Sequence, residues 1–197
     1  MVPATPVRQA LRAALVAQAV PDATSGSGAR LAAVLAPLVE APEPSLVFTV
    51  RSGDLSRHAG EISFPGGLQD PGESLRDTAL REAFEEIGLD PGVVELVGAL
   101  PPVHTVVSGI LVVPFVGMLE TPPVFTVNAG EIDEILTFPV ARLAEVERMV
   151  DVARDGGRVW RGYAYELDGH TIWGATGWML HTLLEVLRKE AAWLIPA

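Results

Sequence analysis

The sequence predicts an α+β fold, in which a few helices pack on a mixed β-sheet, and three observations support this class. The chain has 197 residues, of which 49% are hydrophobic, and this is enough for one domain with a sizeable core. Short apolar runs typical of strands dominate the sequence. Only a few segments have apolar residues at helical spacing, and one of these lies near the middle of the chain. Strands and helices do not alternate regularly, so a mixed sheet is favoured over repeated βαβ units.

The first element expected is an amphipathic helix over residues 6–19. The segment from Ala23 to Ala29 is small, polar and rich in Gly, which is typical of a flexible link. The sequence therefore predicts an N-terminal helix and link over residues 1–28 and one larger domain over residues 29–197.

Strand-like and helical patterns then fill the larger domain. Strands are expected at 30–39, 45–52, 93–100, 109–119, 123–127, 134–140, 158–167 and 170–174. Helices are expected at 74–88, 140–150 and 175–193. The last helix carries Met and Leu at helical spacing, which indicates core packing: Met179, Leu180, Leu183, Leu184 and Leu187.

Charge and composition exclude several kinds of function. The net charge is −11, from 25 acidic and 14 basic residues, which disfavours non-specific binding to nucleic acid. Without cysteine, the chain forms neither disulfides nor thiolate metal sites. No apolar run approaches the ~20 residues that cross a bilayer, and the first residues lack a secretory pattern, so a cytoplasmic location is expected.

The central helical segment concentrates acidic residues. Ser74 or Glu73 is expected to cap its start, and Gly88 to end it. The apolar positions share one stripe on a helical projection: Leu80, Ala83, Phe84 and Ile87. The acids share the opposite side: Glu82, Glu85 and Glu86. Carboxylates beside a Gly-rich loop suit a hard divalent cation such as Mg²⁺ or Mn²⁺.

This segment resembles the Nudix box, G-x5-E-x7-R-E-U-x-E-E-x-G-U, where U is apolar. The fixed positions are filled by Gly67, Glu73, Arg81, Glu82, Ala83, Glu85, Glu86, Gly88 and Leu89. The resemblance implies an α/β/α sandwich around a mixed β-sheet. It also implies an enzyme that uses Mg²⁺ or Mn²⁺ to hydrolyse a nucleoside diphosphate linked to another group.

The resemblance also implies roles for individual residues. Metal ligands are expected at Glu82, Glu85 and Glu86, the last two also being counted as catalytic. Arg81 is expected to orient an acid through an ion pair, with Glu73 as its partner.

The proton acceptor in this family can lie outside the box. Glu131 and Glu134 are two candidates, and the structural alternative is that these acids simply flank a strand.

A second segment resembles the signature of coenzyme A pyrophosphatases within the Nudix family, L-L-T-x-R-S-x3-R-x3-G-x3-F-P-G-G. It matches at Thr49, Arg51, Ser52, Gly60, Phe64, Pro65, Gly66 and Gly67. Ser56 stands where the pattern has Arg, and Arg57 follows one place later. The expected substrate-binding residues are Arg51, Ser52, Arg57, Gly66 and Gly67.

Three functions are therefore open. The first is hydrolysis of coenzyme A, and of its thioesters, to 3′,5′-ADP and 4′-phosphopantetheine. The second is hydrolysis of another nucleoside diphosphate derivative, such as ADP-ribose or NADH. The third is a non-catalytic nucleotide-sensing module, which the intact set of box acids disfavours. The expected partner is a small molecule rather than nucleic acid or a membrane, and the sequence leaves open whether the chain forms a homodimer.

Overall fold

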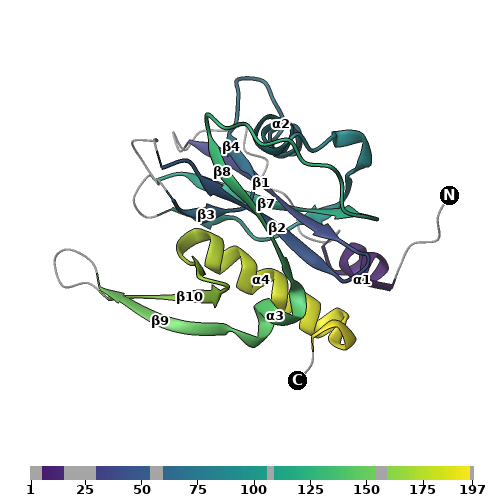
Figure 1. Ribbon diagram of the computed structural model, residues 1–197, viewed down its shortest axis with the longest axis vertical. Coiled ribbons are helices and arrows are strands. Elements are labelled where there is room, and N and C mark those ends of the chain that lie inside the picture. The colour runs from purple at the N-terminus through teal and green to yellow at the C-terminus, as the bar shows by residue number, and fades with distance from the viewer. Residues whose placement is uncertain (1–5, 16–29, 54–59, 106–108, 154–158, 196–197) are drawn as a thin grey trace.

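A central eight-stranded mixed sheet organises the molecule (Figure 1). The computed structural model describes residues 6–15, 30–53, 60–105, 109–153 and 159–195. Strands β1 (Leu31–Val39) and β7 (Leu111–Leu119) are parallel neighbours with nine residue pairs in register. The pairs that flank them are antiparallel, which makes the sheet mixed, as expected.

The remaining strands extend this pair on both sides. The main path runs β3-β2-β1-β7-β5, with β3 at Ile62–Ser63, β2 at Ser45–Arg51 and β5 at Glu95–Ala99. Off this path, β4 (Gly66–Leu68) pairs with β1, β6 (Val103–His104) with β7, and β8 (Ile132–Pro139) with β2.

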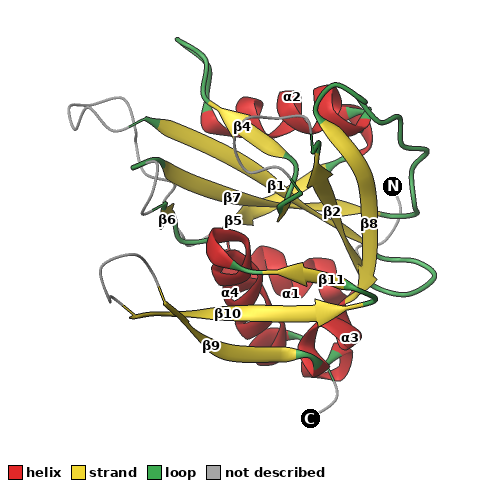
Figure 2. Ribbon diagram, turned by 60° about the vertical axis from the view of Figure 1, so that its left-hand side comes forward, coloured by secondary structure: helices red, strands yellow, loops and turns green. Residues whose placement is uncertain are grey.

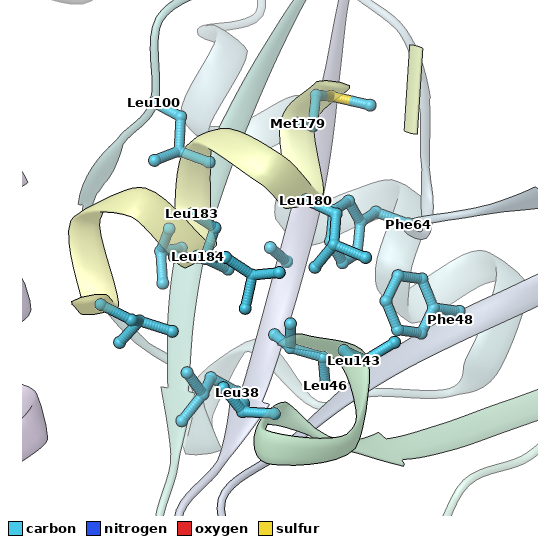
Figure 3. Packing of buried hydrophobic residues seen from close by; sticks show 14 of the residues in the cluster. Leu38, Leu46, Phe48, Phe64, Leu100, Leu143, Met179, Leu180, Leu183 and Leu184 are labelled. Atoms are coloured by element: carbon cyan, nitrogen blue, oxygen red, sulfur yellow. The ribbon is translucent and has the colours of Figure 1, made fainter. Parts of the chain in front are cut away.

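Helices cover both faces of the sheet, because its buried strands alternate apolar side chains to either side (Figure 1). On one face, α2 (Leu75–Ile87) packs against the side of β1 that carries Ala33 and Leu35. On the other face, α1 (Pro6–Leu15) and α4 (Gly174–Glu190) join the cluster that contains Leu38. Figure 3 shows the leucines of α4 within this second cluster.

A smaller sheet lies beyond α4 (Figure 2). It contains β9 (Glu147–Ala153), β10 (Val159–Leu167) and β11 (His170–Ile172), all antiparallel. The short helix α3 (Val140–Glu145) connects β8 to it. Single 3₁₀ turns occupy Pro91–Val93 and Ala192–Leu194.

The predicted α+β class is confirmed, and several expected boundaries are wrong. The helix expected at 140–150 ends at Glu145, because the next residues pair with β10 as strand β9. Residues 123–127 form no strand and instead run past the end of α2. The helix expected at 175–193 ends at Glu190.

The N-terminal helix lies against the main core. It buries Val7, Leu11 and Leu15, spaced four residues apart on one face. Residues 16–19 of the expected helix and the link at 23–29 lie outside the described residues, and the division at residue 28 stays a prediction. Among the described helices, none is long and apolar enough to cross a membrane.

Candidate active site

Helix α2 is fixed at both ends by caps that the sequence predicts. The Ser74 hydroxyl accepts a hydrogen bond from the backbone N–H of Asp77 at 3.1 Å. Gly88 ends the helix with φ 66°, a left-handed conformation that glycine adopts readily, and its N–H donates to the Phe84 carbonyl at 2.9 Å. The helix that carries Glu82, Glu85 and Glu86 is therefore held at its first and last turns.

The buried face of α2 is rotated from the one expected. Phe84 was expected to be buried but is 56% exposed, while Glu86 was expected on the open side but is only 2% exposed. The face that packs on the sheet runs through Ala79, Ala83 and Ile87, and Glu86 lies at its border, under the strand β4 loop. The three acids therefore occupy three environments, since Glu85 is about half exposed and Glu82 is mostly covered.

Arg81 contacts three of the box acids. Its guanidinium binds Glu73 through two nitrogens, at 2.9 and 3.1 Å, so the expected ion pair is present. Its Nη1 also donates to Glu82 at 2.8 Å and to Glu85 at 3.0 Å. A further bond to the Leu68 carbonyl, at 3.2 Å, ties the helix to the loop before it.

Glu73 is the most strongly held of these carboxylates. Hydrogen bonds from Arg81 lower the pKa of Glu73 to about 2, and the Thr78 hydroxyl adds a further bond at 2.7 Å. The same contacts raise the pKa of Arg81. Glu73 therefore stays ionised and serves to fix Arg81.

Glu82 lies directly against the glycine loop. A Cβ placed on Gly67 would lie 2.4 Å from the Glu82 carboxyl carbon, so only glycine lets the carboxylate come this close. Burial raises the pKa of Glu82, and the neighbouring charges of Glu85 and Glu131 raise it further. The bond from Arg81 opposes this shift.

Glu86 is the deepest acid of the site and is incompletely neutralised. Its Oε2 accepts the backbone N–H of Gly66 at 3.1 Å, and Arg51 at the end of β2 comes no closer than 3.7 Å to its Oε1. Burial raises the pKa of Glu86 to about 7, with the charges of Glu82 and Glu131 adding to the effect. A cation at this place would relieve the charge that the protein itself leaves unbalanced.

Glu131 lies just before β8, near enough to the acids of α2 for its charge to act on two of them. Its charge acts on Glu82 and Glu86, and its backbone carbonyl accepts the Ser52 N–H at 2.8 Å. The other candidate, Glu134, is exposed within β8 opposite Val50. Of the two alternatives, the structure brings Glu131 to the acids of α2.

The expected substrate-binding residues are only partly brought together. Gly66, Gly67 and Arg51 lie beside the box acids, and Ser52 is 4% exposed with its N–H already donated to Glu131. Arg57 lies outside the described residues.

Sequence reasoning missed Asn128. Its side chain bonds to Glu131 and its backbone bonds to Glu86. The turn-forming Asn-Ala-Gly at 128–130 was the available signal.

The carboxylates of α2 fit a hard divalent cation in donor type and in charge. Burial raises the pKa values of both Glu82 and Glu86. Glu82 has Arg81 at 2.8 Å, whereas the guanidinium of Arg51 lies 3.7 Å from Glu86, so the charge of Glu86 is the less well balanced of the two. As the side chains stand, no group of three or more His, Asp or Glu in the described part of the chain is arranged to hold a metal ion. Since Arg81 engages Glu82 and Glu85, a shared cation requires these two side chains to turn away from it.

Solved structures with the same fold support the assignment of the architecture. The Nudix domain of Shewanella oneidensis NrtR, solved with ADP ribose, aligns with a TM-score of 0.53 at 16% identity, covering 90% of this chain and 96% of that one. A MutT/nudix family protein from Enterococcus faecalis aligns with a TM-score of 0.52 at 15% identity, covering 87% and 64%. At such identities the likeness concerns the fold.

Sequence relatives identify the family. A model of the NUDIX domain matches residues 29–157. A protein from Escherichia coli named as the uncharacterized Nudix hydrolase NudL is 38% identical over 159 residues, covering 78% of this chain and 81% of the relative. A protein of the same name from Pectobacterium atrosepticum is 38% identical over 157 residues, with the same coverage. With the complete box on α2 and the segments that flank it, these matches show that the chain belongs to the Nudix hydrolase family.

Proposed function

We propose that this Nudix hydrolase cleaves the diphosphate of coenzyme A, and of its thioesters, to 3′,5′-ADP and 4′-phosphopantetheine. One observation carries the proposal: the two sequence signatures meet in space. Arg51, which belongs to the coenzyme A signature, lies 3.7 Å from Glu86, which belongs to the Nudix box. Gly66, also from the coenzyme A signature, donates its backbone N–H to the same carboxylate.

A local cation is needed because the substrate carries several phosphates and the protein carries a net charge of −11. Arg51 supplies one beside Glu86, with its side chain 31% exposed. A guanidinium binds phosphate oxygens through two nitrogens. Among the described residues, the side chain of Arg51 makes a long contact of 3.7 Å to Glu86, which a phosphate can replace. We assign Ser52 to holding the strand end, because its buried N–H is donated to Glu131. Arg57 remains the predicted second cation.

The chain's own residues divide the remaining tasks. Mg²⁺ or Mn²⁺ held by Glu82, Glu85 and Glu86 would neutralise the phosphoryl oxygens and lower the pKa of a bound water. Arg81, locked by Glu73, fixes the helix face on which these acids stand.

Glu131 is assigned as the acceptor of the proton from the attacking water. Its carboxylate accepts a hydrogen bond from the neutral amide of Asn128, whereas Glu73, Glu82 and Glu85 are bound by the guanidinium of Arg81.

The test is a comparison of substrates. Coenzyme A, ADP-ribose and NADH are incubated with Mg²⁺ or Mn²⁺, and the products are separated by chromatography. Release of 3′,5′-ADP from coenzyme A well above the other two rates is the expected result. Turnover of ADP-ribose or NADH alone would leave the metal site in place and overturn the coenzyme A assignment.

One feature favours the second candidate, hydrolysis of another nucleoside diphosphate derivative. Ser56 stands where the coenzyme A pattern has an arginine. A serine cannot supply the charge that a 3′-phosphate requires. Replacing Ser56 by Arg raises the rate on coenzyme A if this position contacts the extra phosphate, and leaves the rate on ADP-ribose unchanged.

A further inference from the structure

The chain between β7 and β8 forms no strand over residues 120–131 and closes in a tight turn beside α2. We propose that Asn128, in this turn, is a positioning residue that aims the Glu131 carboxylate at the reacting water. The inference deepens the proposed function and rests on it, because Glu131 is there the proton acceptor.

The Asn128 side chain makes two bonds within the turn. Its Oδ1 accepts the backbone N–H of Gly130 at 3.2 Å, and its Nδ2 donates to Glu131 Oε1 at 3.2 Å. The Gly130 N–H can only donate, so the amide oxygen must face it and the amide nitrogen must face the carboxylate. The turn therefore ensures that the amide nitrogen of Asn128, and not its oxygen, faces the Glu131 carboxylate.

The Asn128 backbone ties this turn to the catalytic helix. Its N–H donates to the Glu86 carbonyl at 2.9 Å, and two residues earlier the Thr126 N–H donates to the Ile87 carbonyl at 2.9 Å. These two carbonyls belong to the last turn of α2, and the carbonyl groups of a last turn find no hydrogen-bond donor within their own helix. Thus Asn128 contacts the backbone of Glu86 and the side chain of Glu131.

The turn also reaches the substrate side of the site. The Asn128 carbonyl accepts the N–H of Glu131 at 2.9 Å and of Ile132 at 3.0 Å. The Glu131 carbonyl then accepts the Ser52 N–H at 2.8 Å, next to Arg51. One turn consequently fixes the proton acceptor relative to both the acidic helix and the strand end that carries Arg51.

The kind of donor suits a carboxylate that must accept a proton. Glu73 is held by a guanidinium, which lowers its pKa to about 2 and keeps it ionised. Glu131 receives a neutral amide N–H from Asn128, which orients an oxygen without adding a positive charge. An amide at position 128 therefore directs the Glu131 carboxylate without placing a positive charge against it.

The decisive variant is Asn128→Asp. It keeps an oxygen for the Gly130 N–H, so the turn is retained, but it replaces the donor to Glu131 by a second carboxylate. The expected result is a fall in kcat of about tenfold with KM within about twofold, smaller than the roughly 100-fold loss expected for Glu131→Gln. Thr137→Asp, which adds the same charge at an exposed position farther along β8, is the matched control and leaves kcat unchanged.

Coupling between the two positions separates orientation from folding. In a Glu131→Gln background, Asn128→Asp should cause no further fall in kcat, because the group that it positions is already gone. Mn²⁺ affinity, measured by calorimetry, should stay within about threefold of wild type, since the side chain of Asn128 does not touch the acids of α2. If Asn128→Asp does not fold, Asn128→Ser serves instead, since it keeps a short acceptor but does not reach Glu131.

Three outcomes overturn the inference: an unchanged kcat in Asn128→Asp, losses that multiply in the double variant, or a large fall in Mn²⁺ affinity. All rates are taken on whichever nucleoside diphosphate derivative the wild type hydrolyses fastest. If the wild type does not hydrolyse coenzyme A but hydrolyses another of these compounds, the proposed substrate is wrong and this test still applies. If it hydrolyses none of them, both the proposed function and this inference are overturned.

Discussion

A buried glutamate, Glu86, and a part-buried one, Glu147, both lie between a helix and a sheet but have opposite environments. Glu86 lies between α2 and the main sheet and is 2% exposed. Glu147 begins β9 beside α4, with its side chain 12% exposed. Both are carboxylates at a junction of helix and sheet, so burial alone predicts a raised pKa for each.

The donors around them decide the outcome. Glu86 receives one backbone N–H, from Gly66, and burial raises its pKa to about 7. Around Glu147, burial acts in the same direction but is outweighed by three partners, and its pKa is lowered. These are the Tyr165 hydroxyl at 2.6 Å, His181 Nδ1 at 3.0 Å and Arg188 Nη2 at 2.6 Å.

The difference separates a binding site from a structural contact. The part-buried carboxylate of Glu147 is satisfied by three donors and links β9, β10 and α4. Glu86 receives one backbone N–H and a long contact of 3.7 Å from Arg51, so its charge is weakly balanced and an external cation can add the missing positive charge. We therefore expect Glu86 to matter for activity and Glu147 for stability.

The largest effect is expected from Glu86→Gln. The change removes one charge from the metal site and should lower kcat about 1,000-fold, the upper range for loss of one group that stabilises the transition state. Stability should not fall, because the amide avoids the unfavourable burial of a charge. Steady-state rates and urea unfolding of the same preparation check this, and a destabilised Glu86→Gln would break the comparison.

The reverse pattern is expected for Glu147→Ala. Removing the carboxylate leaves the hydroxyl of Tyr165, which is 0% exposed, without its acceptor, so the free energy of unfolding should fall by about 2–3 kcal/mol. kcat at a temperature where the variant is folded should stay near wild type. Glu185→Gln is the control, because its exposed pair with Arg188 should contribute less than about 0.5 kcal/mol.

A smaller effect is expected from Gly67→Ala. The new Cβ would meet the carboxylate of Glu82 at 2.4–2.5 Å, and because this is the end of a flexible side chain, Glu82 would move and the fold would persist. We expect about a tenfold loss of kcat with little change in melting temperature. Gly162→Ala on β10, where the nearest atom is Trp178 Nε1 at 3.9 Å, is the matched control and should change neither quantity.

The smallest expected effect is on the pH dependence of stability, measured by urea unfolding without metal. Because the folded pKa of Glu86 lies above its unfolded value of 4.5, its contribution is complete below that value and is lost as the pH rises through about 7. The folded pKa of Glu147 is lowered, so its contribution is present above the unfolded value and is lost as the pH falls. As the pH rises toward 8, the free energy of unfolding of Glu86→Gln should therefore increase relative to wild type, and that of Glu147→Gln should decrease relative to wild type. Parallel curves for the two variants would contradict this.

Spacing along the chain predicts the local parts of the site well. The Ser74 and Gly88 caps follow from local spacing. The contact of Arg81 with Glu73, which the resemblance to the Nudix box implies, also depends on residues within one helix and its flank. The nine box positions also predict the family, which the comparisons confirm.

Burial by segments distant in the sequence could not be predicted from the sequence. A helical projection places Glu86 beside Glu82 and Glu85, and only the return of the chain at Gly66, twenty residues earlier, shows that it is buried. Likewise, the sequence of β9 predicts a continuation of α3, and only the pairing of β9 with β10 shows that it is a strand. The choice between Glu131 and Glu134 depended on how β8 meets β2, a contact between segments about eighty residues apart.

The central claim is that the unbalanced charge around Glu86, and not burial of a carboxylate as such, creates the cation site. Mn²⁺ titration by calorimetry of wild type, Glu86→Gln and Glu147→Gln tests it most directly. The account predicts the same affinity for wild type and Glu147→Gln, and at least a tenfold loss for Glu86→Gln. Equal Mn²⁺ binding by all three proteins would contradict it.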